Sequence, residues 1–264
     1  MIRTAAVVLA LFACARIAPA QEASESRKDT PRITTLGVDD TYQNFMGDIE
    51  PWHVASVSLG QRTSAGSLVA RANVARRFAT TGTQVEVDAY PRLGNGRYAY
   101  LNAGYSSASI FPDWRFGGEL YTNLPDAWEA SLGFRHLRFD TTHVTLYTGT
   151  VGKYSGNYWL SLRPFIRSKA GSTSASASIT GRRYYQDGDN YIGARVGFGS
   201  TPSDQLTPDV AVSRTNSFSA AINGSRSLSS TLLGTWSLGG DSEEITTTET
   251  RRSITGSAGL KIRL

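Results

Sequence analysis

The amino-acid sequence predicts an all-β fold, a single antiparallel transmembrane β-barrel of about fourteen strands, with about twelve as the alternative. Three observations predict it. Polar and apolar residues alternate with a period of two along most of the 264 residues, as they do in strands whose two faces meet different surroundings. Turn-forming clusters separate these runs at longer intervals than the roughly 8–12 residues of a soluble sandwich. No run of about 18 apolar residues indicates a helix that spans a membrane.

The first twenty residues have the pattern of a secretory signal peptide. Arg3 precedes the apolar run Ala5–Cys14, and Ala18-Pro19-Ala20 is a small-residue cleavage pattern. The alternative, a lipoprotein signal ending at Cys14, fits less well because a bulky residue stands near the cleavage point. We therefore expect three segments: a cleaved signal peptide at residues 1–20, a polar, disordered periplasmic lead-in at residues 21–31, and the barrel at residues 32–264.

Composition argues against several classes of protein. The chain is 19% charged and has one cysteine, so neither a charged disordered tail nor a disulfide framework is expected. Loss of the leader removes two arginines from a formal net charge of +5, and the remainder is too small for a nucleic-acid-binding surface. Three separated histidines and a single cysteine provide no zinc spacing. We expect no metal, no cofactor and no nucleic-acid partner.

The expected strands follow the alternating runs in order. Val85–Tyr90, Trp159–Phe165 and Ser253–Leu264 are clear examples. Turn clusters at residues 92–96, 123–126 and 186–190 separate such runs. From residue 32 onward each strand with its connection takes about 17 residues, which suits a membrane strand followed by a turn. The strands are expected to centre near residues 37, 57, 73, 87, 101, 118, 133, 147, 161, 179, 195, 220, 235 and 257.

An even strand number places both termini in the periplasm. With a periplasmic N-terminus, the connections after the odd-numbered strands lie outside the cell, where longer loops are usual. The expected outer loops include Gln43–Pro51, Ser106–Pro112, Gly199–Val212 and Asp241–Glu249. Aromatic residues at the ends of runs are expected to form girdles at the two lipid–water interfaces. These residues are Tyr98, Tyr105, Trp114, Tyr121, Trp128, Phe139, Tyr154 and Tyr184.

The last eight residues resemble the C-terminal assembly signal of outer-membrane barrels. A polar residue is followed by a glycine and then by two spaced hydrophobic residues, namely Ser257, Gly259, Ile262 and Leu264. That signal usually ends in phenylalanine, so Leu264 departs from it. The resemblance implies recognition by the barrel assembly machinery. It also implies contact with outer-membrane lipid and lipopolysaccharide, and a location in the outer membrane of a Gram-negative bacterium.

Seven stretches after residue 32 together resemble the YaiO family of outer-membrane β-barrel proteins. They are Val87–Leu93, Tyr98–Ser106, Ile110–Tyr121, Trp128–Phe139, Thr148–Phe165, Gly181–Tyr185 and Tyr191–Pro202. The resemblance implies an outer-membrane barrel, and it implies no particular transported substrate or activity. A link to the export of surface polysaccharide is an analogy between folds.

If the apolar set of each strand faces lipid, the other set faces a lumen. The lumen-facing candidates are Arg71, Arg77, Glu86, Asp88, Tyr90, Arg115, Glu119, Tyr121, Glu129, Arg135, Trp159, Arg163, Arg182, Tyr184, Tyr191 and Arg195. Opposed charges select polar solutes, and aromatic rings offer stacking faces to sugars. The expected function is a porin-like pore or export conduit for a hydrophilic solute such as a saccharide. The alternative is a non-conducting structural or assembly barrel in which these charges only pair with one another.

A lipid-modifying enzyme is the second alternative. Hydrolysis would need a histidine that activates a serine. His53 with Ser56 or Ser58 is one candidate pair, and His143 lies near Asp140. His136 falls on the apolar set of its strand. Serines are abundant in this chain, so these pairings are unspecific, and we expect no catalysis.

Overall fold

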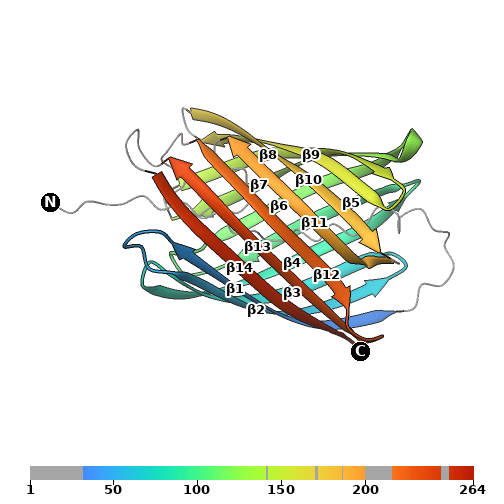
Figure 1. The fold of residues 1–264 in the computed structure, drawn as a ribbon, viewed down its shortest axis with the longest axis horizontal. Helices are drawn as coiled ribbons and strands as arrows, with labels where there is room; N and C mark the ends of the chain where they lie inside the picture. The colour runs from blue at the N-terminus through green and yellow to red at the C-terminus, as the bar shows by residue number, and fades with distance from the viewer. Residues whose placement is uncertain (1–31, 141, 170–171, 186, 200–215, 245–249) are drawn as a thin grey trace.

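The computed structural model describes residues 32–140, 142–169, 172–185, 187–199, 216–244 and 250–264, and these residues form a closed β-barrel (Figure 1). The expected signal peptide and lead-in lie outside the described residues. No helix in the described part of the chain is long and apolar enough to cross a bilayer.

Fourteen strands are present in the described residues, and each contains one of the fourteen positions expected from the alternation. One short 3₁₀ turn, η2 (Pro125–Ala127), separates β6 from β7. The strands are β1 (Ile33–Phe45), β2 (Trp52–Thr63), β3 (Gly66–Arg77), β4 (Thr80–Gly94), β5 (Arg97–Tyr105), β6 (Trp114–Leu124), β7 (Trp128–Phe139), β8 (Thr142–Ser155), β9 (Tyr158–Lys169), β10 (Ser172–Tyr185), β11 (Asp187–Gly199), β12 (Ser217–Ser227), β13 (Leu232–Glu244) and β14 (Thr250–Arg263).

Each strand pairs with the next strand along the chain, and β14 pairs with β1 to close the barrel. The closing register runs from Thr35 opposite Arg263 to Phe45 opposite Ser253. Closure matters because hydrocarbon offers no partner to a backbone N–H or C=O, so a sheet that spans a membrane cannot have an edge. The predicted fold class is therefore confirmed, with fourteen strands rather than twelve.

The two faces of the sheet have opposite chemistry. Outward positions are apolar and exposed, for example Leu132 at 76% and Leu160 at 60%. The alternating inward positions are mostly polar and buried, such as Glu119 and Thr150 at 2% each. A continuous exposed apolar surface of this kind suits lipid rather than water.

Aromatic girdles lie at both ends of the outer surface, but several of their members differ from those expected. Tyr105, Trp114 and Trp128 are exposed on the outer surface as predicted. The prediction was wrong for the other five, because run ends were chosen without regard to which face of the strand each position occupies. Buried or half-buried positions on the inner face hold Tyr98, Tyr121, Phe139, Tyr154 and Tyr184. Further exposed members of the girdles are Tyr42, Tyr158, Tyr185, Phe198, Phe218 and Trp236.

The two ends of the barrel differ in their connections. Short turns join β2 to β3, β4 to β5 and β8 to β9 at the end where β14 finishes, which we call the periplasmic end. The opposite, outer end carries Ser106–Pro112 as expected, whereas Gly199–Val212 lies almost wholly outside the described residues. The predicted starts of two outer loops, at Gln43 and Asp241, were too early in the chain. Strand pairing continues through Phe45 in β1 and through Glu244 in β13, where consecutive polar residues hide the alternation.

Candidate functional site

The inner face of β1 to β9 is divided into three tiers along the barrel axis. We call them the aromatic tier at the periplasmic end, the charged tier in the middle and the apolar tier at the outer end. The apolar tier contains two clusters that sequence reasoning missed, Phe45 with Trp52 and Leu137 with Phe139, Val144 and Leu146. The three tiers together define what a solute in the barrel would meet.

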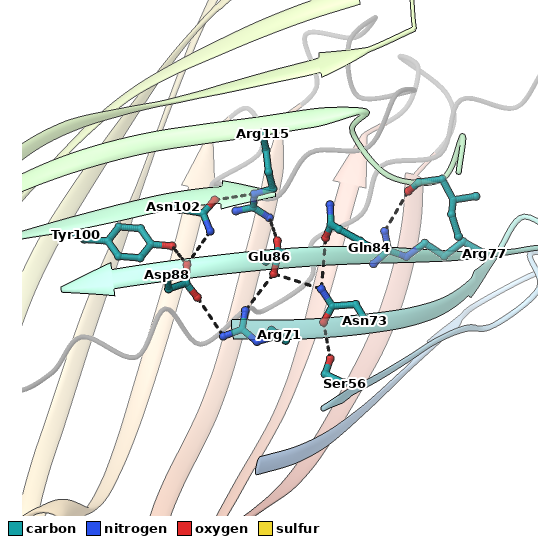
Figure 2. Close-up of polar contacts among 11 residues, drawn as sticks. Ser56, Arg71, Asn73, Arg77, Gln84, Glu86, Asp88, Tyr100, Asn102 and Arg115 are labelled. Carbon is teal, nitrogen blue, oxygen red and sulfur yellow. Dashed lines mark hydrogen bonds and ion pairs between the residues drawn. The ribbon is translucent and has the colours of Figure 1, made fainter. Parts of the chain in front are cut away.

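The charged tier begins with a cluster on β3 to β6, drawn in Figure 2. Arg71 of β3 donates to Glu86 at 3.1 Å and to Asp88 at 3.2 Å. Arg115 of β6 forms an ion pair with Glu86 at 2.8 Å. Glu86 is thus held between guanidinium groups from both sides, and Asp88, two residues further along β4, is paired with Arg71. Pairing of this kind offsets the large cost of burying charge.

Neutral side chains complete this cluster. The Tyr100 hydroxyl donates to Asp88 at 2.9 Å, and the Asn102 amide donates to the same oxygen at 2.6 Å. Asn102 in turn accepts a hydrogen bond from Arg115 at 2.9 Å, and Asn73 donates to Glu86 at 3.2 Å. Because each carboxylate has several partners, its position is fixed by more than one strand (Figure 2).

A second cluster centres on Glu119 of β6. Its Oε2 accepts from Arg135 of β7 at 3.1 Å and from Arg163 of β9 at 3.0 Å, while Ser131 donates to Oε1 at 2.6 Å. Arg163 also donates to the Tyr121 hydroxyl at 3.0 Å. The Glu119 side chain is fully shielded from solvent, and one carboxylate here serves two guanidinium groups. Glu129 of β7 is close enough to Arg163 to interact with it electrostatically, so two carboxylates face two guanidinium groups in this cluster.

The aromatic tier lies on the periplasmic side of these clusters. Tyr98 and Tyr121 stack at 4.5 Å between ring centroids, and Tyr90 and Tyr100 lie 5.1 Å apart. On β9 to β11 the Arg182 guanidinium carbon lies 5.5 Å from the centroid of the Trp159 ring and 4.6 Å from that of the Tyr191 ring. Ring faces and a cation are thus combined at one level of the barrel.

The connection between β5 and β6 folds against the inner wall of the barrel. Ile110 and Phe111 are almost fully buried and pack on Ala75 of β3. Arg77, which is labelled in Figure 2, donates to the Ile110 carbonyl at 3.5 Å. Its guanidinium also lies over the Phe111 ring, 5.1 Å from the ring centroid. Gly82 leaves the space for this connection, because a Cβ there would lie 2.4 Å from that of Ala108. The connection narrows the outer mouth.

Small hydroxyl side chains are frequent on the remaining inner wall, which also holds a buried ion pair between Arg251 of β14 and Glu243 of β13 at 2.6 Å. Alternate positions of β10 to β14 hold the buried residues Ser176, Ser178, Ser219, Ser225, Ser237, Ser253 and Thr255. Hydroxyl groups both donate and accept hydrogen bonds.

All sixteen lumen-facing candidates occupy positions that alternate with the exposed apolar residues of their strands. Buried candidates are Arg77, Glu86, Asp88, Glu119, Tyr121, Glu129, Arg135 and Trp159. Partly buried candidates are Arg71, Tyr90, Arg115, Arg163, Arg182, Tyr184, Tyr191 and Arg195. The candidates for the C-terminal assembly signal divide between faces. Ser257 and Gly259 lie on the inner face, and Ile262 and Leu264 are exposed on the outer surface.

The candidate His–Ser pairs at His53 do not form. His53 lies on the outer surface of β2, where its Nε2 is 2.6 Å from Asp40 Oδ2. Ser56 and Ser58 lie on the opposite face of the same strand, because they are three and five residues away in a period of two.

The other two histidines also face outward. His136 forms a hydrogen bond with Thr145 at 2.9 Å and stacks on His143, with 5.8 Å between the ring centroids. Among the described residues no group of His, Cys, Asp and Glu could hold a metal ion. Among the described residues, Asp140 forms no hydrogen bond or ion pair with His143.

A closed barrel with an apolar outer surface, aromatic girdles and a polar inner face defines an outer-membrane β-barrel. The model of the YaiO membrane beta barrel domain matches residues 33–204, and the chain belongs to this family. No curated protein sequence matches the chain.

Two solved structures show the similarity of fold. A CymD monoaromatic hydrocarbon channel gives a TM-score of 0.55 at 10% identity, over 94% of this chain and 92% of that one. A bacterial polysaccharide outer membrane secretin gives a TM-score of 0.56 at 9% identity, over 88% of this chain and 98% of that one. At such low identity these matches concern the fold alone.

Proposed function

We propose that this barrel conducts a hydrophilic solute, of the saccharide class, across the outer membrane. The observation that carries the proposal is the arrangement of the inner face, where ordered ion pairs, ring faces and hydroxyl groups lie at successive levels. Saccharides bind through ring faces that stack and through hydroxyls that hydrogen-bond, and this inner face offers both. The similarity to a polysaccharide secretin agrees with this solute class.

A non-conducting structural barrel is the second candidate. It is favoured by the tight packing of the ion pairs, since Glu119 and Arg135 have side-chain exposures of 0% and 4%. In that case the charges would satisfy one another, and the barrel would serve the membrane or an assembly. Conduction is favoured instead by the inner wall at Arg182, Tyr191 and Arg195, because these side chains are only partly buried and so remain accessible to solvent.

We further propose two partners for the outside of the barrel. The exposed girdle residues, including Trp114 and Trp128, would contact outer-membrane lipid and lipopolysaccharide. The outward residues Ile262 and Leu264 on the last strand would be the side chains that the barrel assembly machinery recognises. Replacing both by serine should lower the amount of assembled barrel in cells without lowering synthesis.

Single-channel recording in a planar bilayer tests the function. The purified protein, shown to be folded by its heat-modifiable migration, should give stable open steps that added oligosaccharides interrupt. Open steps that no saccharide affects would overturn the solute class. Silence from a folded barrel would overturn conduction and support the structural candidate.

A further inference from the structure

We infer that the outer surface of the barrel binds an acidic phospholipid near its periplasmic end, with the lipid phosphate on Arg183 of β10. Tyr158 and Tyr185 are in contact with this arginine, and Lys153 of β8 provides a second cation nearby. The inference rests on the proposed contact of the outer surface with membrane lipid and deepens it. It does not depend on conduction or on the solute.

Arg183 is exposed on the lipid-facing side of β10 and lies over two aromatic rings. Its guanidinium carbon is 5.0 Å from the ring centroid of Tyr185 and 5.7 Å from that of Tyr158. Both rings are themselves exposed on the outer surface. A guanidinium group that stacks on rings keeps its N–H donors in its own plane, where they can form two parallel hydrogen bonds with a phosphate.

Lys153 lies as far from the periplasmic end of its strand as Arg183 does. Each is two residues before the last residue of its strand, β8 or β10. Lys153 is level with Leu160 of β9, which is level with Gly181 of β10. Two strand spacings and two residues along the strand therefore separate the Cα atoms of the two cations by about 12 Å. An anionic headgroup at Arg183 is then also attracted by Lys153, whose ammonium group lies 4.8 Å from the ring centroid of Trp128.

The carboxylates of this region lie in the turns. Among the described residues, the outward positions of β7 to β10 hold no aspartate or glutamate. At the β10–β11 turn, Asp187 accepts hydrogen bonds from the backbone and side-chain amides of Asn190, at 3.0 Å and 2.7 Å. Asp189 pairs with Arg263, and Asp126 belongs to the turn η2. Turns project into water, which screens these charges, whereas the two cations stand on the surface that lipid headgroups meet.

The surface beside Arg183 has room for an acyl chain. A Cβ at Gly181, two residues further toward the middle of the membrane, would meet Leu160 Cδ1 at 3.9 Å and no other atom within 4 Å. Leu160, Leu162 and Ile179 are exposed around this position. A phospholipid with its phosphate at Arg183 can therefore extend an acyl chain over this apolar strip, so that both of its ends are in contact with the barrel.

Charge and position together indicate the class of lipid. A zwitterionic headgroup carries its own cation and gains little from two more, whereas phosphatidylglycerol has a net negative charge that basic side chains attract. Arg183 and Lys153 lie at the periplasmic end, and the periplasmic leaflet of an outer membrane consists of phospholipid. We therefore assign the site to an acidic phospholipid rather than to the lipid A of the opposite leaflet.

Native mass spectrometry of the purified barrel tests the site. The protein is equilibrated in detergent with phosphatidylglycerol or with phosphatidylcholine that has the same acyl chains, and the lipid retained on the barrel is counted. Retention of phosphatidylglycerol should need a concentration at least about tenfold lower, because each basic side chain near a headgroup contributes a factor of about five.

Variants locate the effect. Arg183→Gln should raise the phosphatidylglycerol concentration needed for retention by about fivefold, and Lys153→Gln should raise it by less because the lysine is further from the phosphate. Arg183→Lys should recover only part of the loss, since an ammonium group offers no paired donors. Arg226→Gln, on the exposed outer face of β12, is the matched control and should change nothing.

Equal retention of the two lipids by folded protein would overturn the inference, and so would an equal effect of Arg183→Gln and Arg226→Gln. If lipid A displaces phosphatidylglycerol as readily as phosphatidylglycerol itself does, the assignment to the periplasmic leaflet is wrong. If the folded barrel also fails to insert into phospholipid vesicles, the proposed contact with membrane lipid fails as well. Conduction is recorded separately on the unaltered protein, so its failure is distinguished from failure of the lipid site.

Discussion

Glu119 shows how single residues hold this interior together. It receives Arg135 and Arg163 on one oxygen and Ser131 on the other, and so connects β6, β7 and β9. Glu129, on the neighbouring strand, is equally buried, and among the described residues its one hydrogen-bond donor is the Tyr98 hydroxyl, at 3.1 Å. The two glutamates are therefore similarly buried, but Glu119 is hydrogen-bonded to two guanidinium groups and Glu129 to a neutral hydroxyl.

The first prediction compares the same substitution at these two positions. Glu119→Gln should destabilise the barrel by about 3–5 kcal/mol, because two buried guanidinium groups lose their carboxylate. Glu129→Gln should change stability by less than about 1 kcal/mol, because an amide oxygen can accept from Tyr98 equally well. Urea unfolding in lipid vesicles measures both. Equal losses in the two variants would show that burial, not ion pairing, sets the cost.

At the scale of elements, the hairpin between β3 and β4 is under backbone strain. Its two turn residues, Phe78 and Ala79, have φ values of 52° and 58°, in the left-handed region where glycine and asparagine are usual. Phe78 has a reason to be there, because its ring packs against Trp52 at 4.9 Å. For Ala79 no packing contact of this kind is seen in the described chain.

The second prediction follows from this difference. Ala79→Gly should stabilise the barrel by about 0.5–1 kcal/mol, because relief of the left-handed conformation outweighs the added chain entropy. Ala72→Gly, in the middle of β3, is the control and should destabilise it by a similar amount. The midpoint of urea unfolding reports both changes. A loss of stability in Ala79→Gly would mean that the turn is not strained.

The connection between β5 and β6 gives the third prediction. Replacing Ile110 and Phe111 with alanine removes the apolar contacts that hold this connection against Ala75. The open-channel current should then rise, because the connection no longer narrows the outer mouth. The double variant Ser107→Ala and Ser109→Ala changes exposed positions of the same segment and should leave the current unaltered. An unchanged current in the first variant would mean that the narrowest point lies elsewhere.

Elements of this barrel differ in how far the sequence reveals them. Alternation predicts the strands well, because a closed sheet has only two faces and each residue must suit one of them. It placed Glu86 and Asp88 on one face, and they are buried together in the structure. It cannot show that Arg163 reaches Glu119 from β9, because that contact depends on side-chain length and barrel curvature. The strained Phe78-Ala79 turn carries no glycine or asparagine and gave no turn signal.

On the scale of the whole molecule, closure depends on a single pairing between the first and last strands. All other neighbours are joined by connections along the chain, so that loop entropy assists their pairing. Strands β1 and β14 are separated by the entire barrel, yet they pair over eleven positions from Thr35 to Phe45. The Leu264 backbone N–H also donates to Thr34 at 2.9 Å. This seam joins the two ends of the chain into one structure.

The last prediction tests the register of the seam by crosslinking. Leu36 of β1 and Ile262 of β14 are direct partners on the outer surface, so cysteines at both positions should form a disulfide, in a background where Cys14 is serine. Leu36 paired with a cysteine at Lys261 is the control, and it should not crosslink because Lys261 points to the inner face. A disulfide between these two positions joins the chain near its two ends into a ring. Non-reducing electrophoresis of heat-denatured samples separates such crosslinked chains from linear ones. A crosslink in the control alone would mean that the closing strands are shifted by one residue, which would turn every side chain of β14 to the other face and move Lys261 and Arg263 into lipid. Because such a shift would be too costly to persist, we expect the seam to close in this register alone.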